Sequence, residues 1–186
     1  MLFSHSESPT EIWQSIKHEL HRGALDPKHP FRFVNLGTLG NGIPQVRTVV
    51  LREVTQNMGF LVFTDFRSEK VKEIQNSHLT ALHFYHPKKM LQVRVEAKAE
   101  IHFQDSLSDN YWRKIPDARK AEYTSCLPPG TPVSNSELGW ESGENSFFTV
   151  LNFIPQRLDV LQLSKEGHIR IQFEKVNEWK GQWLVP

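Results

Sequence analysis

The sequence LQVRVEAKAEIHF, residues 91–103, decides the fold class of this chain. Every odd position in it carries an apolar side chain, and every even position from Gln92 to His102 carries a polar one. Strict alternation over a stretch of this length is typical of a β-strand with one face on a hydrophobic core and the other toward water. The stretch therefore predicts a long strand in a sheet with one wet face.

Short apolar segments bounded by turn residues surround this strand on both sides. The expected strands are residues 31–39, 45–54, 59–64, 79–85, 146–154, 157–163 and 168–174, and residues 183–185 are expected to close the sheet. The first two form a hairpin at Gly40-Asn41-Gly42, because Asn-Gly supplies the positive φ angles of a tight turn. About eight strands with few long helices predict a mainly β (α+β) chain, an antiparallel, barrel-like fold with peripheral helices.

The helical signals lie outside these strands. Ser8-Pro9-Thr10-Glu11 has the pattern of a capping box with proline at the first helical position, and Gly23 is the expected stop. Ser68 is expected to cap a short helix that ends at Asn76. Residues 107–115 and 117–125 predict two further helices. Residues 127–145 contain three prolines and three glycines, so we expect a long surface loop that acts as a lid or faces a partner.

Composition bounds the possible functions. The 186 residues, 38% of them apolar, predict a single domain over residues 1–186. With 22 basic and 21 acidic residues the net charge is +1, which argues against a nucleic-acid-binding barrel, and we expect no nucleic-acid partner. The lone Cys126 excludes an intramolecular disulfide and a cysteine-rich zinc site. No apolar run approaches the roughly 18 residues of a membrane helix and no signal peptide is visible, so we expect a cytoplasmic protein without a membrane partner.

Common catalytic and metal motifs are missing. The glycines at 37, 40 and 42 have the wrong order for a dinucleotide fingerprint, and Cys126 has no identifiable base partner. Among the nine histidines, His18 and His21 fall on the solvent side of the first helix, and His83 and His86 straddle a strand end. We expect surface or structural roles for these histidines and no metal site.

A scattered set of basic and polar residues remains on consecutive β elements. Lys70 and Lys72 lie in the first turn of the short helix, beside Thr64 and Ser68. Cations at a helix N-terminus, which has its own positive partial charge, suit a phosphate monoester. From the residues alone, the alternative is a solvated helix start with ordinary surface charges. The set also includes Arg47, Arg52, Gln92 and Arg94.

Four segments carry a family resemblance: Arg47-Thr48-Val49-Val50-Leu51-Arg52, residues 59–65, Ser68-Glu69-Lys70, and Gln92-Val93-Arg94-Val95-Glu96-Ala97. In order and spacing they resemble the pyridoxamine 5′-phosphate oxidase family of FMN-binding split barrels, over about residues 30–105. Residues 119–132 look more like a divergent branch of that family than the vitamin B6 enzymes themselves. The resemblance implies a split antiparallel β-barrel, FMN as cofactor, oxidoreductase chemistry on an unknown small substrate, and a homodimer with FMN at the interface. Trp112, Trp140 and Phe147 are expected at apolar rims that the second copy covers.

The resemblance also implies a role for individual residues. The FMN phosphate would be held by Arg47 and Lys70, with Ser68 in the same motif. The flavin would be lined by Phe63 and Thr64, approached by the backbone of Val49 and Val50 with Arg52, and contacted by Gln92. One spacing needs an explanation, because residues 47 and 52 of an ideal strand point to opposite faces. A bulge, or a site shared between two chains, would resolve it.

Departures from the family pattern concern the substrate more than the cofactor. Glu69 replaces the arginine of the usual Ser-Arg-Lys, and Arg52 replaces a ring-facing lysine. Tyr111, Ile115 and Arg119 stand where a tyrosine, an arginine and a serine hold the substrate phosphate. His168-Ile169-Arg170 reverses an Arg-x-His, and Leu161 and Gln172 replace a tryptophan and an arginine. The substrate candidates are Tyr111, Arg119, His168 and Arg170; no catalytic acid or base stands out, and the founding reaction is not expected.

Two functions remain open at this point. The first is an FMN-binding oxidoreductase-like protein. The alternative is a non-enzymatic binder that holds flavin, another phosphorylated ligand or haem for storage or sensing.

Overall fold

The computed structural model describes residues 2–134, 143 and 145–186 of the chain. The elements, in chain order, are α1 (Pro9–Leu25), η1 (Pro30–Arg32), β1 (Phe33–Gly40), β2 (Ile43–Val54), β3 (Phe60–Asp65), α2 (Glu69–Asn76), β4 (Leu79–His86), η2 (Pro87–Lys89), β5 (Leu91–Phe103), α3 (Ser106–Lys114), α4 (Asp117–Lys120), η3 (Ala121–Tyr123), β6 (Phe148–Gln162), β7 (Ile169–Glu174), η4 (Lys175–Asn177) and β8 (Gly181–Leu184). The η elements are single turns of 3₁₀ helix.

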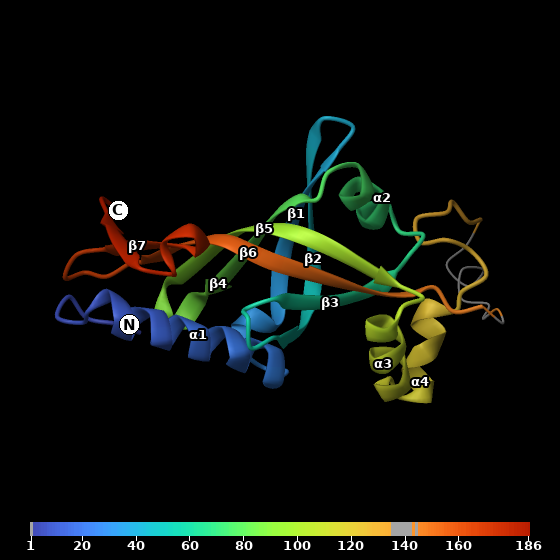
Figure 1. Cartoon of the computed structure of the whole chain (residues 1–186), viewed down its shortest axis with the longest axis horizontal. Coiled ribbons are helices and arrows are strands. Elements are labelled where there is room, and N and C mark those ends of the chain that lie inside the picture. Colours follow the sequence, from blue (N-terminus) through green and yellow to red (C-terminus); the bar gives the residue numbers. More distant parts are fainter. Residues whose placement is uncertain (1, 135–142, 144) are drawn as a thin grey trace.

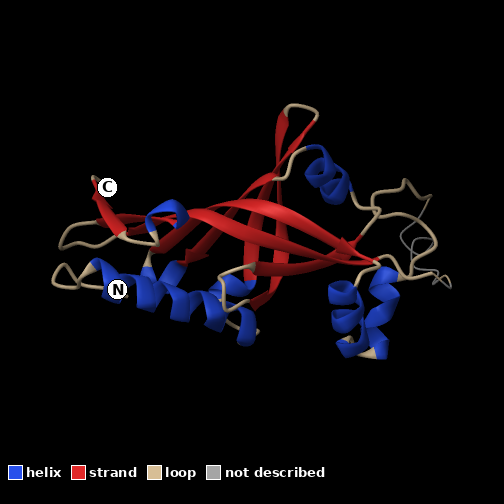
Figure 2. Ribbon diagram, viewed as in Figure 1, coloured by secondary structure: helices blue, strands red, loops and turns tan. Residues whose placement is uncertain are grey.

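The strands form an antiparallel barrel. They are ordered β3-β2-β1-β4-β5-β6, and β3 also pairs with β6, which closes the barrel. The strands β7 and β8 continue the sheet outward from β6, so Trp183 and Leu184 lie in the edge strand β8, Val185 lies beyond it, and they do not close the barrel as expected. The expected split barrel with peripheral helices is confirmed, with strands at the centre and helices around them (Figures 1 and 2).

The alternating stretch forms β5 with the predicted bounds. Its odd residues point into the core, where Val93 and Val95 are buried, and it pairs with β4 on one edge and β6 on the other. The β1–β2 hairpin is also confirmed. Asn41 and Gly42 at its tip have φ angles of 51° and 79°, the two positive values that this type of turn requires.

The segments 146–154 and 157–163, predicted as two strands, form the single strand β6. Its first half pairs with β3 and its second half with β7, while β5 runs along both. The expected gap between residues 154 and 157 is absent, and Pro155 within it lies at a register shift opposite Ala97, where the strand does not need every ladder hydrogen bond. One long strand can therefore belong to the barrel and to its outward extension.

The first helix begins as predicted but ends later. Ser8 and Glu11 form the expected capping box. The helix continues past Gly23 to Leu25, so the expected stop is wrong. Gly23 is needed for packing instead, since a Cβ there would lie 2.6 Å from the Cβ of Phe31.

The other helical predictions are met in part. Ser68 is the N-cap residue of α2, but its side chain makes no capping hydrogen bond. Residues 117–125 form the short α4 followed by the 3₁₀ turn η3 rather than one helix. Residues 135–142 and 144 of the predicted loop 127–145 lie outside the described residues, and its expected role as a lid or partner-facing segment stays a prediction.

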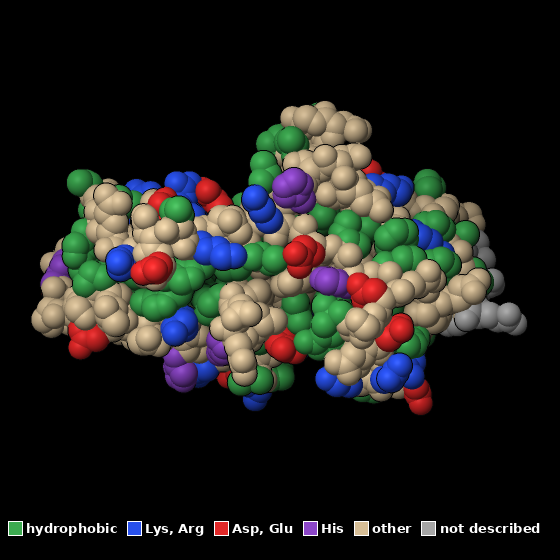
Figure 3. Space-filling model, in the orientation of Figure 1, with side chains coloured by type: hydrophobic (Ala, Val, Ile, Leu, Met, Phe, Trp, Pro, Cys, Tyr) green, Lys and Arg blue, Asp and Glu red, His purple; other side chains and the backbone are tan. Residues whose placement is uncertain are grey.

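Two of the three side chains expected at apolar rims are half-buried and make ring contacts within the chain. Trp112 packs on Phe148 with ring centroids 5.4 Å apart, and the Arg67 guanidinium lies 3.4 Å from the centroid of the Phe147 ring. Trp140 lies outside the described residues, and the covering of these rims by a second copy stays a prediction. On the face shown in Figure 3, basic and acidic side chains are interspersed. None of the described helices is both long enough and apolar enough to span a membrane.

Candidate functional site

Two cations meet where β2, β3 and α2 come together. The Lys70 ammonium donates to Thr64 Oγ1 at 3.1 Å, and the Thr64 and Ser68 hydroxyl oxygens lie 3.3 Å apart. Arg47 reaches the same corner from β2 and pairs with Glu73 of α2, with Nη2 and Oε2 2.6 Å apart. We call Arg47, Thr64, Ser68 and Lys70 the basic corner.

The electrostatics of the basic corner favour an anion. Burial lowers the pKa of Lys70, and the positive charge of Arg47 lowers it further against the opposing effects of Asp65 and Glu73. Asp65 is itself paired with Arg67 at 2.7 Å. Two neighbouring cations, Arg47 and the half-buried Lys70, therefore lie beside one carboxylate, that of Glu73, and a bound anion would relieve their repulsion.

The start of α2 adds donors to this corner. The first N–H groups of a helix have no partner within the helix, and the Ser68 side chain does not cap them. The helix end, two cations and two hydroxyls suit a phosphate group. Lys72, the other predicted cation, is exposed and pairs with Glu69 at 3.4 Å, so it is not part of the corner.

A second group of predicted residues lies on the outer face of β3. The Arg52 guanidinium carbon is 5.6 Å from the centroid of the Phe63 ring, and the Arg52 Nε is buried without a hydrogen-bond partner among the described residues. Tyr111 and Arg119 join them around a cavity of about 120 Å³, which Ile115 also lines.

The Tyr111 hydroxyl is already engaged in this second group. It donates to Glu53 Oε2 at 2.7 Å. Burial and this hydrogen bond to a carboxylate raise the pKa of Tyr111. Tyr111 is therefore a neutral donor whose proton is committed to Glu53.

The third group lies on the outer face of β5, β6 and β7. Gln92 pairs in register with Leu161, and Leu161 pairs with Arg170, so the three form a row across these strands. Gln92 Oε1 lies 3.2 Å from His83 Nε2. Arg170 is held by Asp159 through Nη2–Oδ2 and Nε–Oδ1 contacts of 2.9 and 3.2 Å.

Asp159 is the anchor of the third group, because Arg94 also donates to it. Burial raises the pKa of Asp159, but hydrogen bonds from Arg170 and Arg94 outweigh burial and lower it. His168 does not belong to the row of Gln92, Leu161 and Arg170. It is exposed in the β6–β7 turn, and its Nδ1 accepts from the Ser164 N–H at 3.2 Å.

A bulge exists in β2, yet it does not bring Arg47 and Arg52 to one face. Leu51 pairs with Val62 and Glu53 with Leu61, which leaves Arg52 as the extra residue. Arg47 still faces α2 and Arg52 still faces Phe63. Of the two explanations open from the sequence, the bulge alone is therefore insufficient.

The two valines predicted at the ring differ in exposure. Val49 is 8% exposed, and its side chain belongs to the core, so only its backbone is available. Val50 is half-buried on the outer face and pairs with Phe33. The predicted residues thus form one corner and two outer-face groups, and their individual roles stay predictions.

Sequence reasoning missed Glu73 and Thr38, which hold Arg47 in place. Thr38 donates to Glu73, and Arg47 donates to Thr38. Glu73 follows Lys70 by three positions, which places both on neighbouring positions of the helix surface, and that spacing was the available signal.

A buried group on the other side of the barrel was also missed. Glu19, His29 and His86 offer ligand atoms within 4.8 Å of one another. The Nδ1 atoms of His29 and His86 accept the N–H groups of Phe31 and Lys89, so each neutral ring carries its proton on Nε2. A metal at Nε2 would need the opposite tautomer, and Lys89 already lies 2.7 Å from Glu19. We therefore assign this group a structural role.

Comparison with known proteins gives a consistent result. The family model described as pyridoxamine 5′-phosphate oxidase, FMN-binding domain, matches residues 10–103. The pyridoxine/pyridoxamine 5′-phosphate oxidase of Bdellovibrio bacteriovorus is 26% identical over 146 residues, which cover 78% of this chain and 63% of the relative. The enzyme of the same name from Mannheimia succiniciproducens is 28% identical over 154 residues, 82% of this chain and 63% of the relative. The match thus spans less than two thirds of these relatives.

Solved structures agree on the fold. A pyridoxamine 5′-phosphate oxidase-related, FMN-binding protein from Nostoc punctiforme superposes with a TM-score of 0.78 at 24% identity, over 93% of this chain and 96% of that one. PhzG from Burkholderia lata, solved with tetrahydrophenazine-1-carboxylic acid, has a TM-score of 0.75 at 16% identity, over 100% of this chain and 98% of that one.

Proposed function

The chain belongs to the pyridoxamine 5′-phosphate oxidase FMN-binding domain family, and from this premise we propose that it is an FMN-dependent oxidoreductase acting on a small substrate as a homodimer. FMN is the cofactor of this domain. When bound, it supplies a ring that takes up and releases electrons. The protein's part is to hold that ring and to place a substrate against it.

The basic corner is the observation that carries the proposal. Arg47 and Lys70, with the hydroxyls of Thr64 and Ser68 and the start of α2, form a set of donors suited to the FMN phosphate. Arg52 suits the ring, because its buried Nε has no acceptor among the described residues and a ring nitrogen or oxygen would provide one.

The homodimer is supported by the exposed apolar side chains of the barrel. Phe33, Val46 and Leu79 are 61%, 73% and 62% exposed on β1, β2 and β4. By alternation they share the outer face with Val50 and Gln92. A second copy on this face would cover apolar surface that water otherwise meets, and would enclose a flavin ring lying there.

A shared site also accounts for the arrangement of Arg47 and Arg52. Arg47 and Arg52 face opposite sides of β2 in one chain. One chain alone therefore does not surround a ligand with the basic corner and both outer-face groups. We propose that the phosphate lies in the basic corner of one copy and that the outer-face residues complete the ring site with the other copy. We also propose a cytoplasmic location, where the exposed Cys126 stays reduced.

The substrate is proposed only as a small molecule other than the family's founding substrates. The Tyr111 hydroxyl is engaged by Glu53, and Ile115 lines the cavity where a cation would be needed for a substrate phosphate. Lys114 and Arg119 line the same cavity and leave it cationic on one side.

Two measurements test the proposal. The absorption spectrum of the purified protein, loaded with FMN, should show bound oxidised flavin. Steady-state turnover should then be measured with pyridoxine 5′-phosphate, pyridoxamine 5′-phosphate and tetrahydrophenazine-1-carboxylic acid, and with general reductants in the presence of oxygen. Bound flavin that no reductant reduces would favour the non-enzymatic binder, and a protein that does not retain FMN would contradict the proposal.

A further inference from the structure

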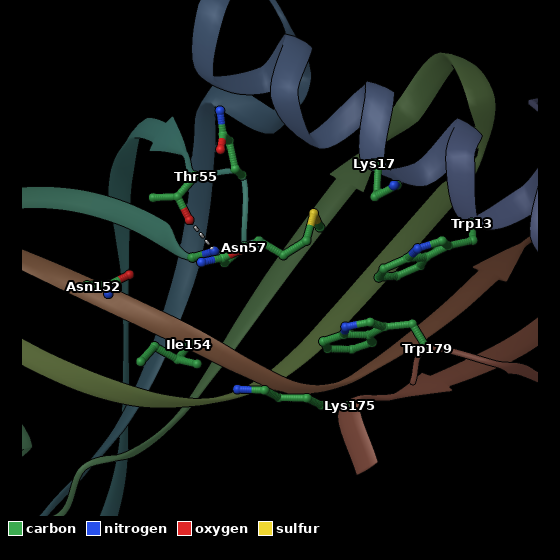
Figure 4. Close-up of a pocket in the computed structure, with 11 residues that line it drawn as sticks. Trp13, Lys17, Thr55, Asn57, Asn152, Ile154, Lys175 and Trp179 are labelled. Carbon is green, nitrogen blue, oxygen red and sulfur yellow. Dashed lines mark hydrogen bonds between the residues drawn. The ribbon is translucent and has the colours of Figure 1, made fainter. Parts of the chain in front are cut away.

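A cavity of about 590 Å³ lies between α1, the β2–β3 turn, β6 and the segment that follows β7 (Figure 4). Its volume is within the roughly 300–1,000 Å³ of small-molecule sites. None of the residues proposed to contact FMN or substrate lines it. It is therefore a separate feature of the chain, and nothing in the proposed function explains it.

One wall of this cavity is aromatic. Trp13 of α1 and Trp179 stack with ring centroids 5.0 Å apart and planes 14° apart, and the Trp13 ring also lies 4.9 Å from Phe173. Figure 4 shows the two indoles together on one side, with Thr55 and Asn57 on the other. Trp13 is buried in the core, so the half-buried Trp179 is the indole that offers an apolar surface to a planar ligand.

The backbone after β7 is bent to place Trp179. Glu178 and Trp179 have φ angles of 55° and 61°, a left-handed conformation that costs non-glycine residues free energy. The Trp179 N–H bonds to the Glu174 carbonyl at 2.9 Å, and the Glu178 N–H bonds to the Lys175 carbonyl at 3.1 Å. These bonds fix the conformation, so the position of the indole is set before any ligand binds.

The opposite wall is a turn that is fixed in a similar way. Met58 has a φ of 64°, and the Gly59 N–H bonds to Thr55 Oγ1 at 2.8 Å. The Thr55 N–H also bonds to the Gly59 carbonyl at 2.8 Å. Two turns held by hydrogen bonds thus face each other across the cavity, so little conformational entropy would be lost in ordering them when a ligand binds.

The charge of the lining is positive. Lys17 and Lys175 line the cavity, and no Asp or Glu does. Neither Lys17 nor Lys175 pairs with a carboxylate within the described residues. The lysines that do are Lys72, Lys89, Lys120 and Lys180. The Lys17 ammonium is 5.9 Å from the centroid of the Trp13 ring, and Figure 4 shows Lys175 extending toward Ile154. The cavity therefore offers two cations that form no ion pair with an acidic side chain in the described part of the chain.

We propose that this cavity is a second ligand site, which binds a planar aromatic carboxylate. The ring would lie against Trp179, and the carboxylate would accept a hydrogen bond from Lys17 or Lys175, which stand on opposite sides of the Trp13–Trp179 pair (Figure 4). A singly charged carboxylate is preferred over a phosphate dianion because the two lysines stand on opposite sides of the indole pair, so a bound anion would meet one ammonium group rather than two. Asn57 and Gln56 supply side-chain amides at the rim for polar substituents of the ring.

The probe is 2-naphthoate, titrated by calorimetry into the FMN-saturated protein. We expect saturable binding of one molecule per chain. Two comparators separate the contributions: 2-naphthamide keeps the ring without the charge, and cyclohexanecarboxylate keeps the charge without the aromatic ring. Each should bind at least about tenfold more weakly, which corresponds to ~1.4 kcal/mol.

Variants locate the site. Lys17→Gln with Lys175→Gln should weaken 2-naphthoate at least about tenfold and leave 2-naphthamide unchanged. Trp179→Leu should weaken both. Lys180→Gln is the matched control, because Lys180 is exposed, pairs with Glu178 at 3.6 Å and does not line the cavity. All variants should retain FMN, since none touches the basic corner.

Several results would overturn the proposal. They are the absence of saturable binding up to the solubility of 2-naphthoate, equal affinity for 2-naphthoate and 2-naphthamide, an unchanged affinity in the lysine double variant, or displacement of 2-naphthoate by added FMN. The lysine variant alters partly or fully exposed side chains, so the test stands even if Trp179→Leu does not fold.

Discussion

The guanidinium of Arg47 lies 2.6 Å from the carboxylate of Glu73, which is 5% exposed. The arginine expected to hold a phosphate therefore has an anionic partner in the same chain. Glu73 fixes the position of Arg47, and Lys70 supplies the second positive charge of the basic corner. The corner keeps a surplus of positive charge that a phosphate dianion can satisfy.

We expect Arg47→Ala to weaken FMN binding about 10- to 150-fold, because charge-assisted hydrogen bonds contribute ~1.5–3 kcal/mol each. Riboflavin lacks the phosphate, so its affinity should be weaker in the parent chain and nearly unchanged in the variant. Fluorescence titration of both flavins measures this. Lys72→Ala is the control, because Lys72 lies on the same helix but pairs with Glu69. Equal affinities of the parent chain for FMN and riboflavin would sink the assignment.

The same substitution should also affect stability. Arg47→Ala leaves the buried Glu73 carboxylate with the Thr38 hydroxyl as its remaining side-chain donor, and we expect a loss of about 1–3 kcal/mol in the free energy of unfolding. Adding Glu73→Gln removes the uncompensated charge and should recover part of that loss without restoring FMN affinity. Urea unfolding of the three flavin-free proteins is the measurement. A double variant no more stable than Arg47→Ala would contradict the pairing.

The proposed dimer predicts a change in molecular mass. Phe33→Glu places a charge on the apolar outer face, where the parent side chain is 61% exposed. We expect light scattering to give a dimer for the FMN-loaded parent chain and a monomer with weakened FMN binding for Phe33→Glu. Val176→Glu changes an apolar side chain that is 83% exposed in η4, and it should leave both properties unchanged. A parent chain that binds FMN as a 21.6 kDa monomer would rule out the shared site.

Much of the fold could be predicted because its signals are local. Alternation defined β5, and Asn41-Gly42 defined the hairpin, since both depend on neighbouring residues only. The signals that misled depend on tertiary structure. Residues 146–154 and 157–163 were expected as two strands, but β5 pairs along both and holds them together as β6. Gly23 suggested a helix end, but it makes room for Phe31.

The site could be predicted less completely, for the same reason. Arg47 and Lys70 followed from the family pattern, and the structure brings them together. Lys72 was expected beside them, but the helix turns it outward to Glu69. Glu73 became recognisable as a partner of Arg47 only once α2 was packed on the barrel, because this contact spans 26 positions.

The buried group of Glu19, His29 and His86 predicts acid sensitivity. Burial, then the positive charge of Lys89 and the nearby His29, lower the pKa of His86 below its ordinary 6.5. As pH falls below 6.5, the unfolded chain binds a proton that the folded chain does not, so the free energy of unfolding decreases. Burial raises the pKa of Glu19, but Lys89 and His29 outweigh burial and lower it, which adds a further loss of stability below pH 4.5.

His86→Gln should flatten the decline in thermal stability between about pH 6.5 and 5, where one proton difference gives at most ~1.4 kcal/mol per pH unit. Thermal unfolding across this range is the measurement. His18→Gln alters an exposed histidine of α1 and should keep the parent slope. If His86→Gln declined as steeply as the parent chain, the titration would belong to another group.

The protein should be a poor oxidase of pyridoxine or pyridoxamine 5′-phosphate even when saturated with FMN. A substrate phosphate needs donors of its own, and the Tyr111 hydroxyl already donates to Glu53 at 2.7 Å. Ile115 lines the cavity in place of a cation, and the cavity of about 120 Å³ is small for such a substrate. Losing one charged hydrogen bond costs ~1.5–3 kcal/mol, and a substrate ring misplaced by ~1 Å lowers the rate a further ~10²-fold. The kcat/KM of this protein should therefore be about three orders of magnitude below that of an enzyme that makes these contacts.

Peroxide or pyridoxal phosphate formation from both substrates measures this activity. A gain of activity provides the sharper test. Glu53→Gln removes the negative charge beside Tyr111, and Ile115→Arg adds a cation to the same cavity. The double variant should therefore bind a substrate phosphate better than the parent chain does. We expect its kcat/KM to rise about tenfold or more, since a charged hydrogen bond is worth at least ~1.5 kcal/mol. Efficient turnover by the parent chain, above about 10⁴ M⁻¹s⁻¹, would show that Arg119 and Lys114 already supply what Ile115 lacks.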